Sequence, residues 1–180
     1  MSGRAIVRYA LGWLAAGLAV AALAVVALNA TDAQPERRAA RPQDPSGAVL
    51  ASHCVLRRPG IDAPASTRPP VSGPPAPAAP AGVYVAAPPM RELIGALRRG
   101  SVVLQYRRTL STRVVEALRR GVKAIGTRTI LTPDASGMRF VIAITAWGRL
   151  LGCDRVDGRV LAALKEFAQR NVGRGPDATG

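Results

Sequence analysis

The chain has 180 residues, room for one domain of ordinary size, and its formal net charge is +14 at pH 7. Hydrophobic residues make up 48% of the sequence but aromatic residues only 4%, so a core must be built mainly from small aliphatic side chains. Nearly all the positive charge is arginine, since Lys123 and Lys165 are the only lysines. The arginines are scattered and not interleaved with aromatic residues, which argues against a nucleic-acid-binding surface and also fits a GC-rich genome. A basic surface remains able to attract anionic lipids or acidic envelope polymers.

The N-terminal segment, residues 1–30, predicts a membrane anchor. It contains LGWLAAGLAVAALAVVAL, an uncharged run just long enough to cross a bilayer as a helix. A cleaved signal peptide is the alternative, because ATDA follows, but the apolar run is longer than a signal sequence usually has. Arg4 and Arg8 favour an N-terminus inside the cell, whereas Arg37, Arg38 and Arg41 oppose that orientation.

Residues 31–82 predict an extended spacer. Proline, alanine, glycine and serine dominate stretches such as RPPVSGPPAPAAPAG. A segment of this composition buries too little apolar surface to offset the entropy lost on ordering, and it favours polyproline conformation. We therefore expect residues 31–82 to hold a domain away from the membrane.

Residues 83–180 predict a small α+β domain with the element order β-α-β-α-β-β-α, that is, a mixed sheet with packed helices. The segment RFVIAITAW is the most apolar strand and is expected to be central. Ser111 is expected to cap the second helix, and Gly121 to end it. The clearest helix, DGRVLAALKEFAQRNVG, is expected to be capped by Asp157 and to end at Gly173.

The pentapeptide ALRRG occurs twice, and each copy places two arginines before a glycine. Arginines in a last helical turn interact favourably with the negative end of the helix dipole, and glycine permits the left-handed residue that ends a helix. An ordinary helix end explains both copies. The alternative is an anion-binding site formed by Arg98, Arg99, Arg119 and Arg120.

The residues predict no catalytic, cofactor or metal site. His53 is the only histidine and lies in the predicted spacer, which excludes a His-rich metal cluster and makes a nucleophile–histidine pair implausible. No phosphate-binding glycine loop is present. Asp154 and Asp157 are close in sequence, but Asp157 is explained as a helix cap.

Cys54 and Cys153 are the only cysteines. In an exported chain an even number permits a disulfide, which would close a loop of nearly 100 residues and stabilise the fold by up to about 4.7 kcal/mol. Two unrelated thiols are the alternative, with Cys153 as a small buried residue. The sequence leaves both open.

Several blocks taken in order resemble the bacterial domain of unknown function 3105, across about residues 69 to 177. They are PPVSGPP, GVYVAAPP, LIGALRRGSVVLQY, ITAWGRLLGCDRVD and NVGRGPD, of which TAWGRLLGCDRVD is the most specific. Members of this family are typically exported proteins with an N-terminal membrane segment. The resemblance therefore implies a domain outside the cytoplasm, but it implies no established activity.

The chain departs from the family pattern at residues that would suit a metal. The first block usually ends in histidine, where this chain has Pro75. The helix-end block usually reads His-x-x-Glu-His-Gly, where this chain has Gly95, Arg98, Arg99 and Gly100. Arginine offers no lone pair to a metal. We therefore expect a divergent member that has lost the possible ligands and binds no divalent transition metal.

Taken together, the sequence predicts a membrane-anchored extracytoplasmic protein whose domain is a non-catalytic binding or scaffolding module. One alternative is an arginine-rich module that binds lipid head groups or an anionic envelope polymer. The other is an enzyme whose site is not recognisable.

Overall fold

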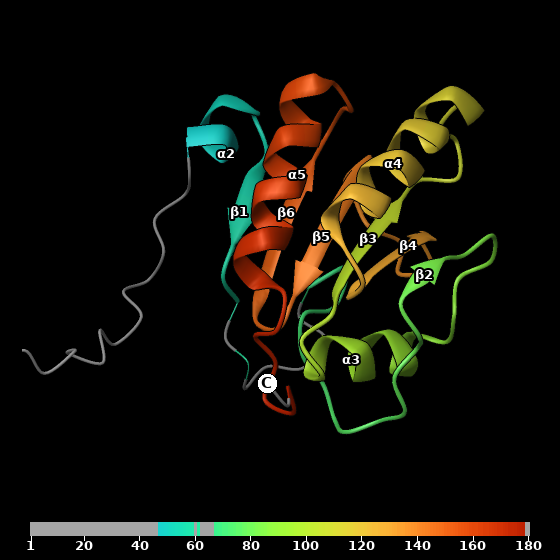
Figure 1. Ribbon diagram of the computed structural model, residues 1–180, viewed down its shortest axis with the longest axis vertical. Coiled ribbons are helices and arrows are strands. Elements are labelled where there is room, and N and C mark those ends of the chain that lie inside the picture. The colour runs from blue at the N-terminus through green and yellow to red at the C-terminus, as the bar shows by residue number, and fades with distance from the viewer. Residues whose placement is uncertain (1–46, 60, 62–66, 179–180) are drawn as a thin grey trace, which may run out of the picture. The chain divides into compact units, whose positions relative to one another are not determined.

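A six-stranded mixed β-sheet organises the computed structural model, which describes residues 47–59, 61 and 67–178 (Figure 1). The strands lie in the order β1-β6-β5-β3-β4-β2. Four helices accompany them in the described part of the chain. In chain order the elements are α2 (Gly47–Ala51), β1 (Val55–Arg57), β2 (Gly82–Val83), α3 (Met90–Arg98), β3 (Val102–Tyr106), α4 (Thr112–Ile125), β4 (Thr129–Pro133), β5 (Ile142–Ala146), β6 (Arg149–Cys153) and α5 (Gly158–Asn171).

The two central strands, β3 and β5, are antiparallel to each other and buried along their whole length. Next to β3 lies β4, which is parallel to it, and β2 follows parallel to β4. Next to β5 lies β6, which is antiparallel to it, and β1 follows antiparallel to β6. The expectation that the apolar RFVIAITAW segment forms a central strand is confirmed, as is the mixed sheet of an α+β fold.

Alternate residues of the strands serve two separate cores. Leu104 and Ile144 point to the face that α4 and α5 cover, where Figure 1 shows these helices side by side. On the opposite face, Val103 and Ile130 pack against α3 through Leu93 and its neighbours. A smaller cluster around Phe140 completes that second face. The helices α3 and α4 therefore lie on opposite sides of the sheet.

Helix α5 matches its prediction. The Asp157 carboxylate accepts a hydrogen bond of 2.9 Å from the backbone N–H of Val160, and the helix ends just before Gly173, whose φ is 78°. Helix α3 likewise ends at the predicted stop, since Gly100 takes φ 80°.

Helix α4 corrects the prediction that Gly121 ends it. The helix continues to Ile125, and Gly126, with φ 120°, follows it. Leu118, Val122 and Ile125 recur at helical spacing on the core side, so their burial keeps the chain helical through Gly121. Ser111 occupies the N-cap position, but its side chain makes no capping hydrogen bond.

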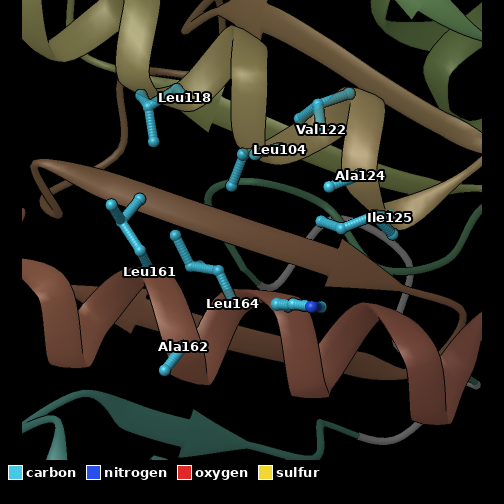
Figure 2. Close-up of a pocket in the computed structure, with 10 residues that line it drawn as sticks. Leu104, Leu118, Val122, Ala124, Ile125, Leu161, Ala162 and Leu164 are labelled. Atoms are coloured by element: carbon cyan, nitrogen blue, oxygen red, sulfur yellow. The ribbon is translucent and has the colours of Figure 1, made fainter.

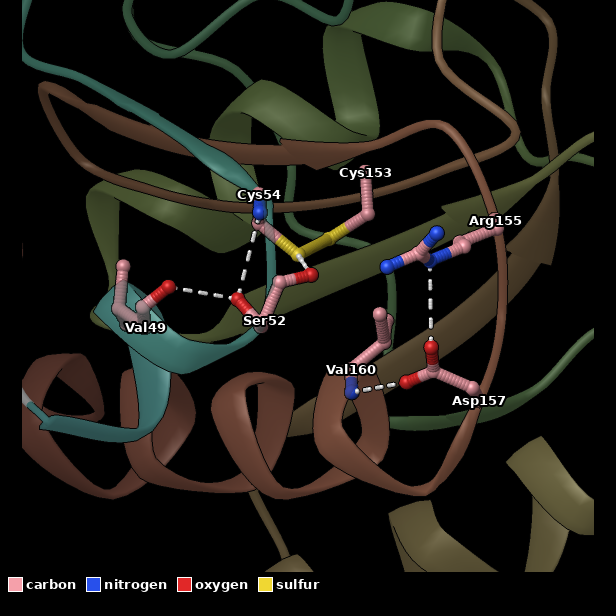
Figure 3. The surroundings of a disulfide bond; sticks show 7 residues. All are labelled: Val49, Ser52, Cys54, Cys153, Arg155, Asp157 and Val160. Carbon is pink, nitrogen blue, oxygen red and sulfur yellow. Dashed lines mark hydrogen bonds and ion pairs between the residues drawn. A yellow bond between two sulfur atoms is a disulfide. The ribbon is translucent and has the colours of Figure 1, made fainter.

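Two strands absent from the predicted order, β1 and β6, are joined by the disulfide between Cys54 and Cys153 (Figure 3). Strand β6 forms a hairpin with β5. Gly148, in the turn that connects the two strands, takes φ 68°. Strand β1 pairs with the far edge of β6, and Ser52, just before Cys54, donates a hydrogen bond to the carbonyl of Val49.

This arrangement corrects the predicted limits of the spacer and domain. Helix α2 and strand β1 lie inside the range 31–82, as do Val71 and Ala79, which are buried in the two hydrophobic clusters of the second face. Composition favoured an extended chain, but pairing with β6 and the disulfide order this part. The single strand predicted at GVYVA is also shorter than expected, because β2 covers only Gly82–Val83.

Within the described ranges, no helix combines the length and apolar character needed to cross a membrane. The predicted anchor, residues 1–30, lies outside those ranges.

Candidate functional site

The structure divides the four arginines of the two ALRRG copies into two pairs. Arg98 and Arg99 stand at the end of α3, whereas Arg119 and Arg120 lie in the middle of α4. Because these helices cover opposite faces of the sheet, the pairs do not combine into one site.

Arg98 is engaged in contacts within the protein. Its Nε and one Nη atom donate to the two carboxylate oxygens of Asp177, at 2.7 and 2.9 Å. A further Nη donates to the carbonyl of Gly73 at 3.4 Å, and the guanidinium lies 5.2 Å from the ring centre of Trp147. The four segments that meet here each belong to a sequence block that carries the family resemblance. We conclude that Arg98 ties these blocks together and has little capacity left for an external anion.

The position where the family pattern has its first helix histidine, Gly95, is closed. A β-carbon at Gly95 would overlap the carbonyl oxygens of Ala76 and Pro77, because the chain there crosses directly over the helix. No side chain fits without moving that backbone. Around this helix end and elsewhere in the described ranges, no group of three or more His, Cys, Asp or Glu residues is placed to hold a metal ion.

The second pair, Arg119 and Arg120, lines a surface hollow of about 350 Å³ together with Lys123. Its other lining residues are Val83, Val85 and Glu116. A neighbouring hollow of about 400 Å³ shares Arg119 and adds Arg108. We call these two hollows together the α4 basic hollow.

The α4 basic hollow has a surplus of positive charge. Its cationic side chains are Arg108, Arg119, Arg120 and Lys123, and its one carboxylate is Glu116. Glu116 accepts a hydrogen bond of 2.9 Å from Arg119, one turn later on the helix. The Nε–H of Arg119 is buried and has no hydrogen-bond partner in the described part of the protein. This surface can therefore accept an anion, because among the described residues only one carboxylate competes with that anion for the four cations.

Sequence reasoning missed Arg108 and Lys123. Lys123 follows Arg119 and Arg120 at the spacing of one helical turn, a signal hidden by the expectation that the helix stops at Gly121. Arg108 comes from the loop after β3, and only the tertiary fold brings it to α4.

A separate basic group surrounds Arg149 at the start of β6. Its guanidinium donates a hydrogen bond of 2.9 Å to the Asn171 side chain, which links β6 to the end of α5. Burial lowers the pKa of Arg149, and the nearby charges of Arg58 and Arg174 lower this pKa further. Arg149 thus serves a structural contact.

The two aspartates close in sequence do not form an acid–base pair. Asp157 caps α5 and also pairs with Arg155 at 3.2 Å (Figure 3). Asp154 is exposed. The hydrogen bond from the Val160 backbone holds the pKa of Asp157 below its usual value, with a smaller contribution from Arg155. A carboxylate so stabilised in its ionised form is poorly suited to donate a proton near neutral pH.

Comparison with known proteins gives one match. The family model described as a protein of unknown function, DUF3105, matches residues 64–179, which is more than half of the chain. No curated protein and no solved structure matches the chain. The chain therefore belongs to the DUF3105 family.

Proposed function

We propose that this protein is a membrane-anchored, extracytoplasmic binding module without catalytic activity, and that its domain binds anionic groups in the α4 basic hollow. The observation that carries the proposal is the gathering of four cationic side chains around one carboxylate. One of these cations, Arg119, also has an Nε–H donor without a partner among the described residues.

The chemistry of the hollow favours phosphate groups. Guanidinium groups donate parallel hydrogen bonds that match phosphate oxygens, and three of the four cations are arginines. Val83 and Val85 supply an apolar wall beside them, and both are exposed. The ligand class is therefore a phosphate-bearing envelope polymer or lipid head group.

Two observations support a location outside the cytoplasm. A disulfide links Cys54 and Cys153, and such bonds persist mainly in exported proteins. The apolar run within residues 1–30 has the length and composition of an anchor.

The binding test uses the full chain in phosphatidylcholine nanodiscs, with inorganic polyphosphate as the probe and calorimetry as the measurement. The variant Arg119→Ala, Arg120→Ala, Lys123→Ala should weaken binding at least about threefold, given about 0.2–1 kcal/mol for each exposed charge contact. Replacing part of the phosphatidylcholine with phosphatidylglycerol tests the source of the phosphate, since competition with polyphosphate would identify lipid head groups as the ligand.

A matched control removes the same number of charges elsewhere. Arg91, Arg139 and Arg159 are exposed and lie outside the hollow, so their triple alanine variant should keep most of the affinity. Equal losses of polyphosphate affinity in the two triple variants would mean that binding depends only on the net charge of +14, and the proposed site would be wrong.

A further inference from the structure

An apolar pocket of about 230 Å³ lies between α4 and α5, with Leu104 of β3 at its base (Figure 2). Leu118 of α4 and Leu161 and Leu164 of α5 point into the space between the helices. The pocket is separate from the α4 basic hollow, and the two share no lining residue. The complete lining is Leu104, Leu118, Gly121, Val122, Ala124, Ile125, Leu161, Ala162, Leu164 and Lys165.

Gly121 helps to keep this pocket open. It lies inside α4, where glycine is less favourable than alanine, and its φ is not in the left-handed region. A β-carbon at Gly121 would meet no atom within 4 Å, so packing does not require glycine there. Because Gly121 has no side chain, the surface of α4 that faces α5 leaves space unfilled at this position.

The lining selects for hydrocarbon. Apart from Lys165, every lining side chain is aliphatic or absent. The volume exceeds that of an engineered cavity of about 150 Å³ that takes up benzene, and it falls below the range of roughly 300–1,000 Å³ that suits drug-sized molecules. A pocket of this intermediate volume suits a single alkyl chain, which is larger than benzene and smaller than a drug-sized molecule.

Lys165 gives the pocket its one charge. Its neighbour Glu166 pairs with Arg170 at 2.7 Å, one turn later on α5. Among the described residues, Lys165 itself forms no ion pair. Lys165 is an exposed residue whose side chain lines the pocket, so its ammonium group is placed to meet an anionic head group.

We infer that this pocket binds the hydrocarbon chain of a free, single-chain carboxylic acid, and that the carboxylate of this ligand pairs with Lys165. Apolar burial between α4 and α5 provides most of the affinity, because an exposed ion pair contributes little. The inference is independent of the anion site on the other side of α4, and either can fail without the other.

The test uses the full chain in phosphatidylcholine nanodiscs and a decanoic acid probe that carries a photoreactive diazirine near its methyl end. After illumination, the labelled peptides are identified by mass spectrometry. Labelling should concentrate in residues 118–125 and 161–165, and excess decanoate should suppress it. Decyltrimethylammonium, which has the same chain and the opposite charge, should suppress it less.

Two variants make the test decisive. Gly121→Leu fills the pocket and should abolish the localised labelling. Lys165→Glu changes an exposed residue, so folding is preserved, and reversing the charge should weaken labelling at least about threefold. The matched control is Arg91→Glu, which reverses the charge of an exposed residue that lines neither the pocket nor the basic hollow; it should leave labelling unchanged. Labelling spread over the whole domain, labelling that decanoate does not suppress, or equal effects of Lys165→Glu and Arg91→Glu would overturn the inference.

Discussion

Arg98 and Asp177 form a two-point ion pair that fastens the C-terminal tail to the end of helix α3, across 79 positions of sequence. The backbone strengthens the link, since the N–H of Asp177 donates to the carbonyl of Arg98 at 2.9 Å. Gly175 allows this approach, because a β-carbon there would overlap the same carbonyl. The helix stop in ALRRG is thus also an anchoring point for the tail.

Removing this ion pair should release the tail. We expect Asp177→Ala to lower the free energy of unfolding by about 1 kcal/mol, since Arg98 is largely buried and the pair is bidentate. Arg98→Ala should cost about 2 kcal/mol, because the side chain also packs on Trp147. Denaturant unfolding measures both values.

The fluorescence of Trp147 gives a second measurement of the same prediction. The chain has two tryptophans, so a Trp13→Phe background leaves Trp147 as the only one. Its emission should change in Arg98→Ala, and Asp154→Ala, which alters an exposed aspartate outside the contact, should leave it unchanged. An unaltered spectrum in Arg98→Ala would contradict the stacking of Arg98 on Trp147.

The disulfide between Cys54 and Cys153 should be the largest single contribution to stability. It closes a loop with a sequence separation of 99 residues, for which chain entropy predicts about 4.7 kcal/mol. Cys54→Ala with Cys153→Ala should therefore lower the free energy of unfolding by up to this amount, and reductant should destabilise the native chain but not the double variant. Alkylation of the native chain without reduction, followed by mass spectrometry, should find no free thiol.

Glycine substitutions should separate steric from conformational roles. Gly121→Ala should stabilise the protein by up to about 1 kcal/mol, since the position is helical and open. Gly126→Ala should destabilise it, because φ there is 120°. Of these three alanine variants Gly95→Ala should be the most damaging, because the backbone of Pro77 occupies the space of the added β-carbon. Gly95→His, with its larger side chain, should be more damaging still. A folded Gly95→His variant would show that the chain over α3 can move.

Acid should remove the stabilisation that the charge of Asp157 provides. Its pKa is lowered in the folded state, so its charge stabilises the fold above the unfolded pKa, near 3.9, and this stabilisation is lost as the pH falls through the folded value. Asn also caps helices well but carries no charge. The native chain should therefore be more stable than Asp157→Asn at pH 7, with the difference vanishing at a pH below the lowered pKa. A difference independent of pH would exclude the charge as the cause.

The parts of the fold that the sequence predicted are those governed by local signals. Asp157 and Gly100 lie at helix ends, where capping depends only on residues close in sequence. The spacing of the apolar residues in α5 fits a helix and no other element. Strand β1 lacks such a signal: three residues in a proline-rich region become a strand only because β6 and a disulfide hold them. Strand β6 was missed because Gly152 interrupts its apolar run, and the ring of Phe140 packs where a side chain at Gly152 would lie.

The candidate site was predictable only in part. Arg119 and Arg120 stood out as a charged pair, but assigning Gly121 as a helix stop concealed that Lys123 continues the same surface. In the folded protein Arg98 is engaged by Asp177, so it is not available to the candidate anion site. Asp177 is 79 residues away, and no local sequence pattern indicates this contact. The apolar pocket could not be predicted at all, because it depends on the spacing between α4 and α5.

The most direct test of anion binding in the α4 basic hollow is the salt dependence of polyphosphate binding to the full chain. Each cation that contacts phosphate should contribute about one unit to the slope of log K against log salt concentration. The variant with Arg119, Arg120 and Lys123 changed to alanine should therefore have a slope smaller by about three units than the native chain, and the control with Arg91, Arg139 and Arg159 changed should keep the native slope. An equal slope for the native chain and the hollow variant would contradict the proposed function.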